Sequence, residues 1–149
     1  MKLSDNFSLA EMTKSQTALR KGIDNTPTEA EVAKLKLLCE KVLQPVREHF
    51  GRPVTVNSGF RCLKLNRAIG SKDTSQHRKG EAADIEIPGV PNKELAEWIR
   101  DNLEFDQLIL EFYRDDDPAA GWVHVSFKDG DLRNQCLTIG KSGTKVGLG

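Results

Sequence analysis

The segment Ala83-Asp84-Ile85-Glu86-Ile87 alternates apolar and acidic side chains and ends at Pro88-Gly89. Successive side chains of a β-strand point to opposite faces, so this period of two residues predicts a strand with one buried and one polar face. The segment Trp122–Phe127 shows the same alternation. If the apolar residues of both strands face one core, Asp84 and His124 can share the opposite, concave face of a sheet.

The remaining segments place helices mainly before these strands and further strands around them. Serine or threonine followed three residues later by glutamate, as in residues 8–11 and 28–31, is typical of a helix start. An apolar stripe extends the second helix over 29–49, where Pro45 is expected to kink it. Further helices are predicted over 63–69 and over 92–103 with Asn92 as N-cap, and further strands over 54–57, 107–113 and 135–139. These elements predict an α+β fold with a mostly antiparallel sheet.

The composition predicts one folded domain over residues 1–140, followed by a flexible tail over residues 141–149. Hydrophobic residues make up 38% and charged residues 30% of the 149, which excludes a disordered chain. The 22 basic residues balance the 22 acidic ones, which argues against nucleic acid as a partner. The three cysteines are widely spaced and form no C-x-x-C pair, so neither a disulfide scaffold nor a cysteine-based zinc finger is expected.

The sequence contains no apolar run with the length of a signal-peptide core or of a membrane span. We therefore expect synthesis in the cytoplasm without a signal peptide, no membrane insertion, and a monomer.

Three side chains form a candidate metal site. His77 precedes Asp84 by seven residues, with Gly80 between them to allow a tight turn. The imidazole can then fold back toward the carboxylate, while His124 approaches from another strand. Two imidazoles and one carboxylate suit Zn²⁺, with a fourth position left to water. The alternative is that these are hydrogen-bonded polar residues at strand ends, without a metal.

Three motifs then carry a resemblance to a known family. Residues 75–84, SQHRKGEAAD, resemble the S-x-H-x-x-G-x-A-x-D motif of the zinc D-Ala-D-Ala carboxypeptidase family. Residues 122–124, WVH, resemble its closing W-x-H, and residues 58–61, SGFR, its upstream S-G-[FY]-R. The resemblance implies the hedgehog/DD-peptidase fold, in the compact single-domain form common in phages and prophages. It also implies that the metal ligands are His77, Asp84 and His124.

The resemblance further implies a zinc metallopeptidase that hydrolyses an amide bond in peptidoglycan stem peptides through zinc-bound water, as a carboxypeptidase or an endolysin-type endopeptidase. A phage-type lysin without a signal peptide would be released by a holin or packaged in a virion. Arg61 would hold a substrate carboxylate or the oxyanion, because a guanidinium forks onto such groups. Ser75 would position substrate or the metal loop, or only form a turn. Trp122 would line the substrate pocket, or pack in the core.

The sequence departs from the family at the catalytic base. Relatives generally carry Glu or His two or three residues before the last ligand, where this chain has Trp122 and Gly121. We expect Glu111 to replace that base if its strand neighbours the His124 strand; the alternatives are a structural glutamate, or Glu81 or Glu86 as the base. The missing base also leaves open a non-catalytic zinc-binding module that binds cell wall or a protein partner.

Overall fold

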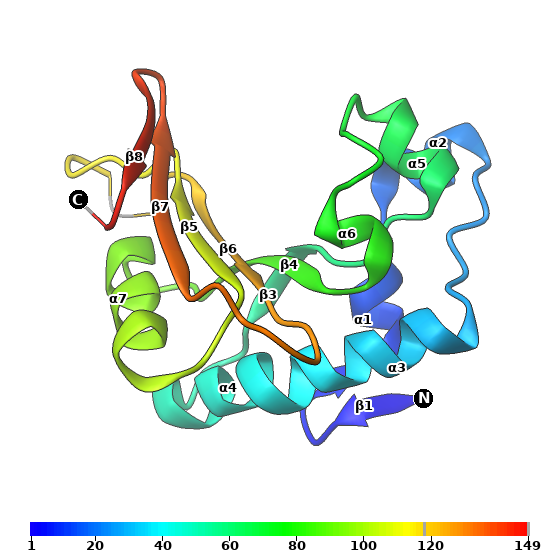
Figure 1. Ribbon diagram of the computed structural model, residues 1–149, viewed down its shortest axis with the longest axis horizontal. Coiled ribbons are helices and arrows are strands. Elements are labelled where there is room, and N and C mark those ends of the chain that lie inside the picture. Colours follow the sequence, from blue (N-terminus) through cyan, green and yellow to red (C-terminus); the bar gives the residue numbers. More distant parts are fainter. Residues whose placement is uncertain (118, 149) are drawn as a thin grey trace.

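A six-stranded sheet with the order β3-β4-β6-β5-β7-β8 forms the centre of the computed structural model, which describes residues 1–117 and 119–148 (Figure 1). Neighbouring strands are antiparallel except β5 and β7, which are parallel. The predicted α+β fold with a mostly antiparallel sheet is thereby confirmed. The six strands are β3 Thr55–Ser58, β4 Ala82–Glu86, β5 Gln107–Glu111, β6 Trp122–Ser126, β7 Gln135–Gly140 and β8 Gly143–Val146.

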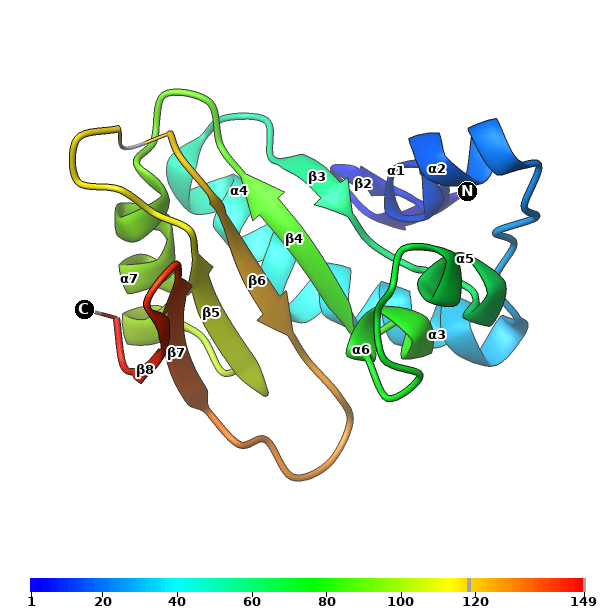
Figure 2. The same ribbon diagram turned by 90° about the horizontal axis from the view of Figure 1, so that it is seen from above.

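The helices divide into two groups around this sheet. Helices α3, α4 and α7 cover one face, while α5 and α6 lie beside the opposite face, across from the β7–β8 arm (Figure 1, Figure 2). The helices are α1 Leu9–Thr13, α2 Gln16–Lys21, α3 Glu29–Leu38, α4 Gln44–Phe50, α5 Leu63–Ala68, α6 Gln76–Lys79 and α7 Asn92–Asn102. A small hairpin of β1 Lys2–Ser4 and β2 Phe7–Ser8 precedes them. Within the described residues, no helix has the length and apolar character needed to cross a membrane.

The core lies between the covered face of the sheet and helices α3, α4 and α7. Apolar residues of β4, β5 and β6 point into it in the predicted alternation. Ile109, although largely buried, is paired with His124 and lies on the opposite face. The fully buried side chains on these strands include Ile85, Leu108, Leu110, Val123 and Val125. The polar side chains between them are thereby directed to the uncovered face, where the candidate site lies.

The helix predicted over 29–49 is present but is not one continuous α-helix. Both predicted capping boxes form, at Ser8 and at Thr28. After α3, residues Cys39–Leu43 form a π-helical turn, in which the Gln44 amide donates to the Cys39 carbonyl. This wider turn precedes Pro45, which has no amide hydrogen and lies in the first turn of α4, where none is needed.

Two details of the predicted elements are wrong. Pro91, not Asn92, is the N-cap of α7, and the Asn92 side chain instead donates to the carbonyls of Ala120 and Gly121. The strand predicted over 107–113 ends at Glu111, because Phe112 turns the chain with a left-handed φ of 55° and is exposed. The Asn92 side chain thus bonds the β5–β6 connection instead of capping its own helix, and the Phe112 amide donates to the Ile139 carbonyl of β7 at 2.7 Å where β5 ends.

The sheet continues beyond the domain end predicted at residue 140. Residues Gly143–Val146, within the predicted flexible tail, form β8 and pair antiparallel with β7. All four residues are exposed, so no buried apolar periodicity marks this strand in the sequence.

A buried carboxylate links the start of β5 to the loop before β7 and to α6. Asp106 accepts hydrogen bonds from the Arg133 backbone amide and guanidinium at 2.7–3.2 Å, and from the Gln76 amide at 2.9 Å. The Arg133 hydrogen bonds are the main reason that the pKa of Asp106 is lowered to about 2, although burial alone would raise it.

This pKa predicts a pH-dependent contribution to stability. Because the carboxylate is favoured in the folded state, its contribution is complete above the unfolded pKa near 4 and is lost as the pH falls through about 2. We expect Asp106→Asn to lower the free energy of unfolding by about 1–2 kcal/mol at pH 7, allowing for solvent screening by the half-exposed Arg133. Denaturant titrations of both proteins between pH 7 and pH 2 should show this difference narrowing; a difference that stays constant would contradict the assignment.

Candidate metal centre

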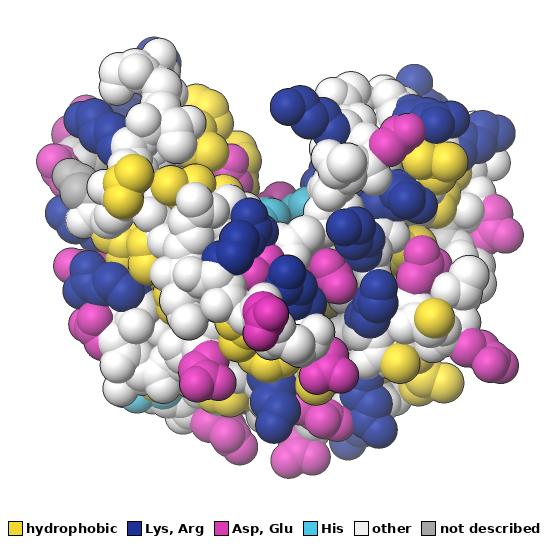
Figure 3. Space-filling view, in the orientation of Figure 1, with side chains coloured by type: hydrophobic (Ala, Val, Ile, Leu, Met, Phe, Trp, Pro, Cys, Tyr) yellow, Lys and Arg dark blue, Asp and Glu magenta, His cyan; other side chains and the backbone are white. Residues whose placement is uncertain are grey.

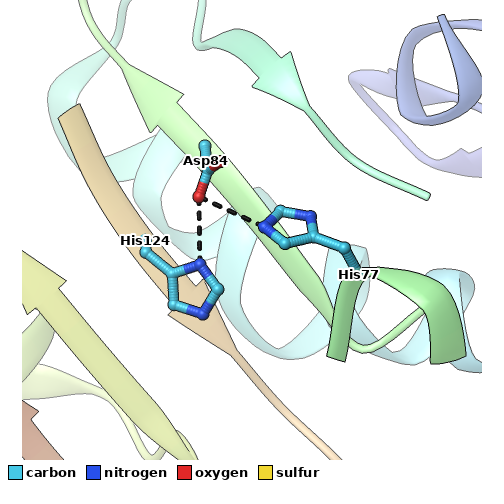
Figure 4. A group of neighbouring side chains, drawn as sticks. All are labelled: His77, Asp84 and His124. Carbon is cyan, nitrogen blue, oxygen red and sulfur yellow. Dashed lines mark hydrogen bonds and ion pairs between the residues drawn. The ribbon is translucent and has the colours of Figure 1, made fainter. Parts of the chain in front are cut away.

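The side chains of His77, Asp84 and His124 meet on the uncovered face of the sheet. Asp84 on β4 is the direct cross-strand partner of His124 on β6, and His77 reaches them from α6. Asp84 Oδ1 lies 3.0 Å from His124 Nδ1 and 3.3 Å from His77 Nε2, as Figure 4 shows. One ligand atom from each residue lies within 4.8 Å of the others, so the group could hold a metal ion.

Contacts with neighbouring backbone and side-chain groups fix the orientation of His77. Its Nδ1 lies 2.8 Å from the Gly59 carbonyl oxygen, which can only accept, so Nδ1 carries the hydrogen and Nε2 presents its lone pair toward Asp84. The Ser75 hydroxyl accepts from the His77 amide and caps α6. Gly80 ends α6 at a φ of 77°, and a Cβ there would lie 2.8 Å from the Glu31 carbonyl oxygen. Only glycine therefore fits this turn between the two predicted ligands.

The local environment favours the protonation states that bind a metal. Burial lowers the pKa of His77, which keeps its imidazole neutral, although Asp84 opposes this effect. Burial alone would raise the pKa of Asp84, but the hydrogen bond from His124 and the neighbouring His77 ring outweigh it and hold the pKa well below its ordinary range. Neutral imidazole and ionised carboxylate are the forms in which these side chains coordinate metals.

The cluster lies in a cleft of about 480 Å³. Figure 3 shows histidine side chains at the bottom of a hollow between the β7–β8 arm and the α5–α6 side of the molecule (Figure 3). The structure brings every predicted site residue to this cleft, because Arg61, Ser75, Glu111 and Trp122 line it together with the three candidate ligands.

Glu111 lies on β5 next to the His124 strand, as the prediction required. It is the cross-strand partner of Trp122, whose indole nitrogen donates to Glu111 Oε2 at 2.8 Å. Burial and the charge of Asp84 raise the pKa of Glu111, while His124, Trp122 and Arg61 partly offset that rise. Glu111 is therefore a partly buried carboxylate with a raised pKa beside the candidate metal ligands.

The other two predicted candidates for the base lie elsewhere. Glu81 is buried, pairs with Lys34 and contacts Gln76, and is not among the residues that line the cleft. Glu86 accepts a hydrogen bond from Asn57 and lines a separate cavity. At Gly121, one of the two positions where the family resemblance predicted a base, a Cβ would collide with the Glu111 carbonyl oxygen. The close approach of the two backbones thus explains why this position has no side chain.

Arg61 lines the cleft, and no acidic side chain that the structure describes contacts its guanidinium directly. Its backbone amide donates to the His77 carbonyl at 3.0 Å. Within residues 1–117 and 119–148, its guanidinium has no hydrogen-bond or ion-pair partner, and its Nε is fully buried. Burial lowers the pKa of Arg61, but the nearby Asp84 and Glu111 raise it, and a guanidinium remains charged at neutral pH. The group is thus available to an anionic ligand.

Two supporting groups were not predicted from the sequence. The Asn25 side chain donates to the carbonyls of Thr13 and Phe60 and accepts from the Cys62 amide, so it holds the chain on both sides of Arg61. Arg133 lines the cleft and bonds Asp106. Both act through contacts between distant segments, which leave no local pattern in the sequence.

Comparison with known proteins places the chain in a family. Residues 5–126 match the family described as Peptidase M15. The chain belongs to the M15 peptidase family. A stretch of 81 residues is also 33% identical to the zinc D-Ala-D-Ala carboxypeptidase of Streptomyces albus G. This stretch makes up 54% of this chain and 31% of that protein. The family resemblance predicted from the motifs is confirmed, while the chain spans under a third of the relative that it matches.

For this M15 member, we predict that Asp84→Asn weakens binding of a divalent metal by at least about tenfold, because it removes the anionic ligand. Metal analysis of the purified protein and competition with a chelating dye would measure the loss. Glu86→Gln is the matched control, since Glu86 lies on the same strand face outside the cluster. Equal metal content in Asp84→Asn and the unaltered protein would contradict the site.

Proposed function

We propose that the protein is a zinc-dependent peptidase that hydrolyses an amide bond in the stem peptides of bacterial peptidoglycan. The observation that supports it most strongly is the meeting of His77, Asp84 and His124 in a cleft that also holds a carboxylate and an unpaired guanidinium. Membership of the M15 peptidase family supports the reaction type. The substrate class rests on the relative named zinc D-Ala-D-Ala carboxypeptidase.

The donor set fits zinc. Two imidazole nitrogens and a carboxylate oxygen are common ligands of catalytic zinc. The cluster contains no cysteine, whereas structural zinc sites usually have cysteine ligands. In this proposal His77 binds through Nε2, because Nδ1 is held by Gly59. When bound in such a site, zinc lowers the pKa of a coordinated water to about 7 and polarises a carbonyl oxygen.

Glu111 serves as the proton-transfer group. Its raised pKa brings it closer to the working pH than an ordinary glutamate, which improves a general base that must later act as an acid. The Trp122 N–H fixes Oε2, so Oε1 remains to accept the proton of the attacking water and to deliver it to the leaving amine. The base thus comes from the neighbouring strand instead of the segment before His124.

Arg61 binds the charged part of the substrate. Its unpaired guanidinium can form two parallel hydrogen bonds to a carboxylate or stabilise the developing oxyanion. The Trp122 ring, which packs 5.6 Å from the Phe112 ring, forms part of the substrate-binding wall. Ser75 contributes through the α6 cap that orients His77. Carboxypeptidase and endolysin-type endopeptidase activity both use this arrangement, and mass analysis of products from defined stem peptides distinguishes them.

We predict that Glu111→Gln lowers kcat by about 10²–10⁴-fold while zinc content is retained, because the substitution removes the proton acceptor and keeps the side-chain shape. Release of new amino groups from purified wall measures the activity, and Glu86→Gln is the control. Full activity of Glu111→Gln would rule out this base. A zinc-loaded, unaltered protein that releases no amino groups would instead favour the non-catalytic zinc-binding module.

A further inference from the structure

A second groove lies next to the metal cleft, with Arg61 in the wall of both. Its volume is about 340 Å³. It is formed by the end of α1 and the start of α2 on one side and by β3 and α5 on the other; the residues used below are Lys14, Phe60, Arg61, Leu65 and Ile69. A substrate that contacts Arg61 from the metal cleft can therefore extend into this groove.

The charge of the groove differs from that of the metal cleft. Its lining contains the two cations Lys14 and Arg61 and no acidic residue, whereas the cleft contains Asp84 and Glu111. In the described part of the chain, neither cation makes a hydrogen bond or ion pair through its side chain. Two cations without a direct partner among the described residues favour an anionic ligand, because a carboxylate gains charge-assisted hydrogen bonds here without displacing an existing partner.

Uncharged side chains complete the groove beside these cations. Phe60 and Leu65 are buried, so Ile69, which is 42% exposed, offers most of the apolar surface. The other lining residues are polar: Ser15, Gln16, Thr17, Asn57 and Ser58. A peptide segment can pack on Ile69 and on these polar groups while its carboxylate contacts the cations.

The two cation-bearing segments are held at a fixed separation. Asn25 Nδ2 donates to the Thr13 carbonyl at 2.9 Å and to the Phe60 carbonyl at 3.0 Å, and Oδ1 accepts from the Cys62 amide at 2.8 Å. The residues beside Lys14 and on both sides of Arg61 are therefore linked through one side chain. Gly59 also packs so closely on the Met12 carbonyl that a Cβ would collide with it. The backbone of the groove is therefore held in place without a ligand.

We infer that the Lys14–Arg61 groove is a second substrate subsite, which binds an internal carboxylate of the peptide on the side of Arg61 away from the metal ligands. This inference rests on the proposed function for its substrate and adds a determinant of substrate selection. Arg61 interacts with the peptide near the metal ligands, and Lys14 adds selectivity for the charged form of the neighbouring residue. Amidation of that carboxylate weakens binding.

The test uses two forms of one stem pentapeptide that contains diaminopimelate. In one form both internal carboxylates are free, and in the other both are amidated, while the C-terminal carboxylate is the same. Binding is followed by NMR on the full-length, zinc-loaded Glu111→Gln chain, so that the peptide stays intact. We expect the free acid to bind about three- to fivefold more tightly and to shift the backbone amide resonances of residues 14–17 and 65–69.

Lys14→Gln should remove most of this preference for the free acid. Lys21→Gln, at the end of α2 and outside the groove lining, should retain it. Equal binding of the two peptides, or an unchanged preference in Lys14→Gln, overturns the subsite. Neither result bears on the proposed peptidase, which fails separately if the unaltered protein binds no zinc or cleaves no stem peptide.

Discussion

The antiparallel pairing of Asp84 with His124 across β4 and β6 is the contact on which the rest of the site depends. The same register buries Ile85, Val123 and Val125 beneath the helices, so the hydrophobic core and the polar cluster are two faces of one pairing. A slip by one residue would turn the carboxylate or the imidazole into the core. Burial of the apolar face therefore enforces the position of the candidate ligands.

The third candidate ligand, His77, depends on contacts outside the sheet. The turn at Gly80, the hydrogen bond from His77 to Gly59 and the cap at Ser75 orient the imidazole locally. One residue earlier, Gln76 joins the buried Asp106 and thus connects α6 to the start of β5. The candidate metal centre is in this way attached to the sheet at two places, after β3 and before β5, which suits a site whose side chains must hold their geometry when a substrate binds.

The sequence predicted features that repeat locally, including the two strands of the cluster, both capping boxes and the place of Glu111 opposite the core. Period-two burial carries that information directly. It did not predict the π-helical turn before Pro45, the end of β5 at Glu111 or the role of Asn92. Asn92 bonds Ala120 and Gly121, which lie 28 and 29 residues away in the chain, so no local pattern records the contact. Asn25 was missed for the same reason: its three partners lie 12, 35 and 37 residues away in the chain.

X-ray absorption spectroscopy at the zinc edge of the metal-loaded protein tests the central claim most directly, since it reports the atoms around the ion. Two imidazole nitrogens at about 2.0–2.1 Å with the remaining positions filled by oxygen would match His77, Asp84 and His124. Sulfur in the first coordination sphere, or oxygen ligands without imidazole, would mean that the metal binds elsewhere and would contradict the account.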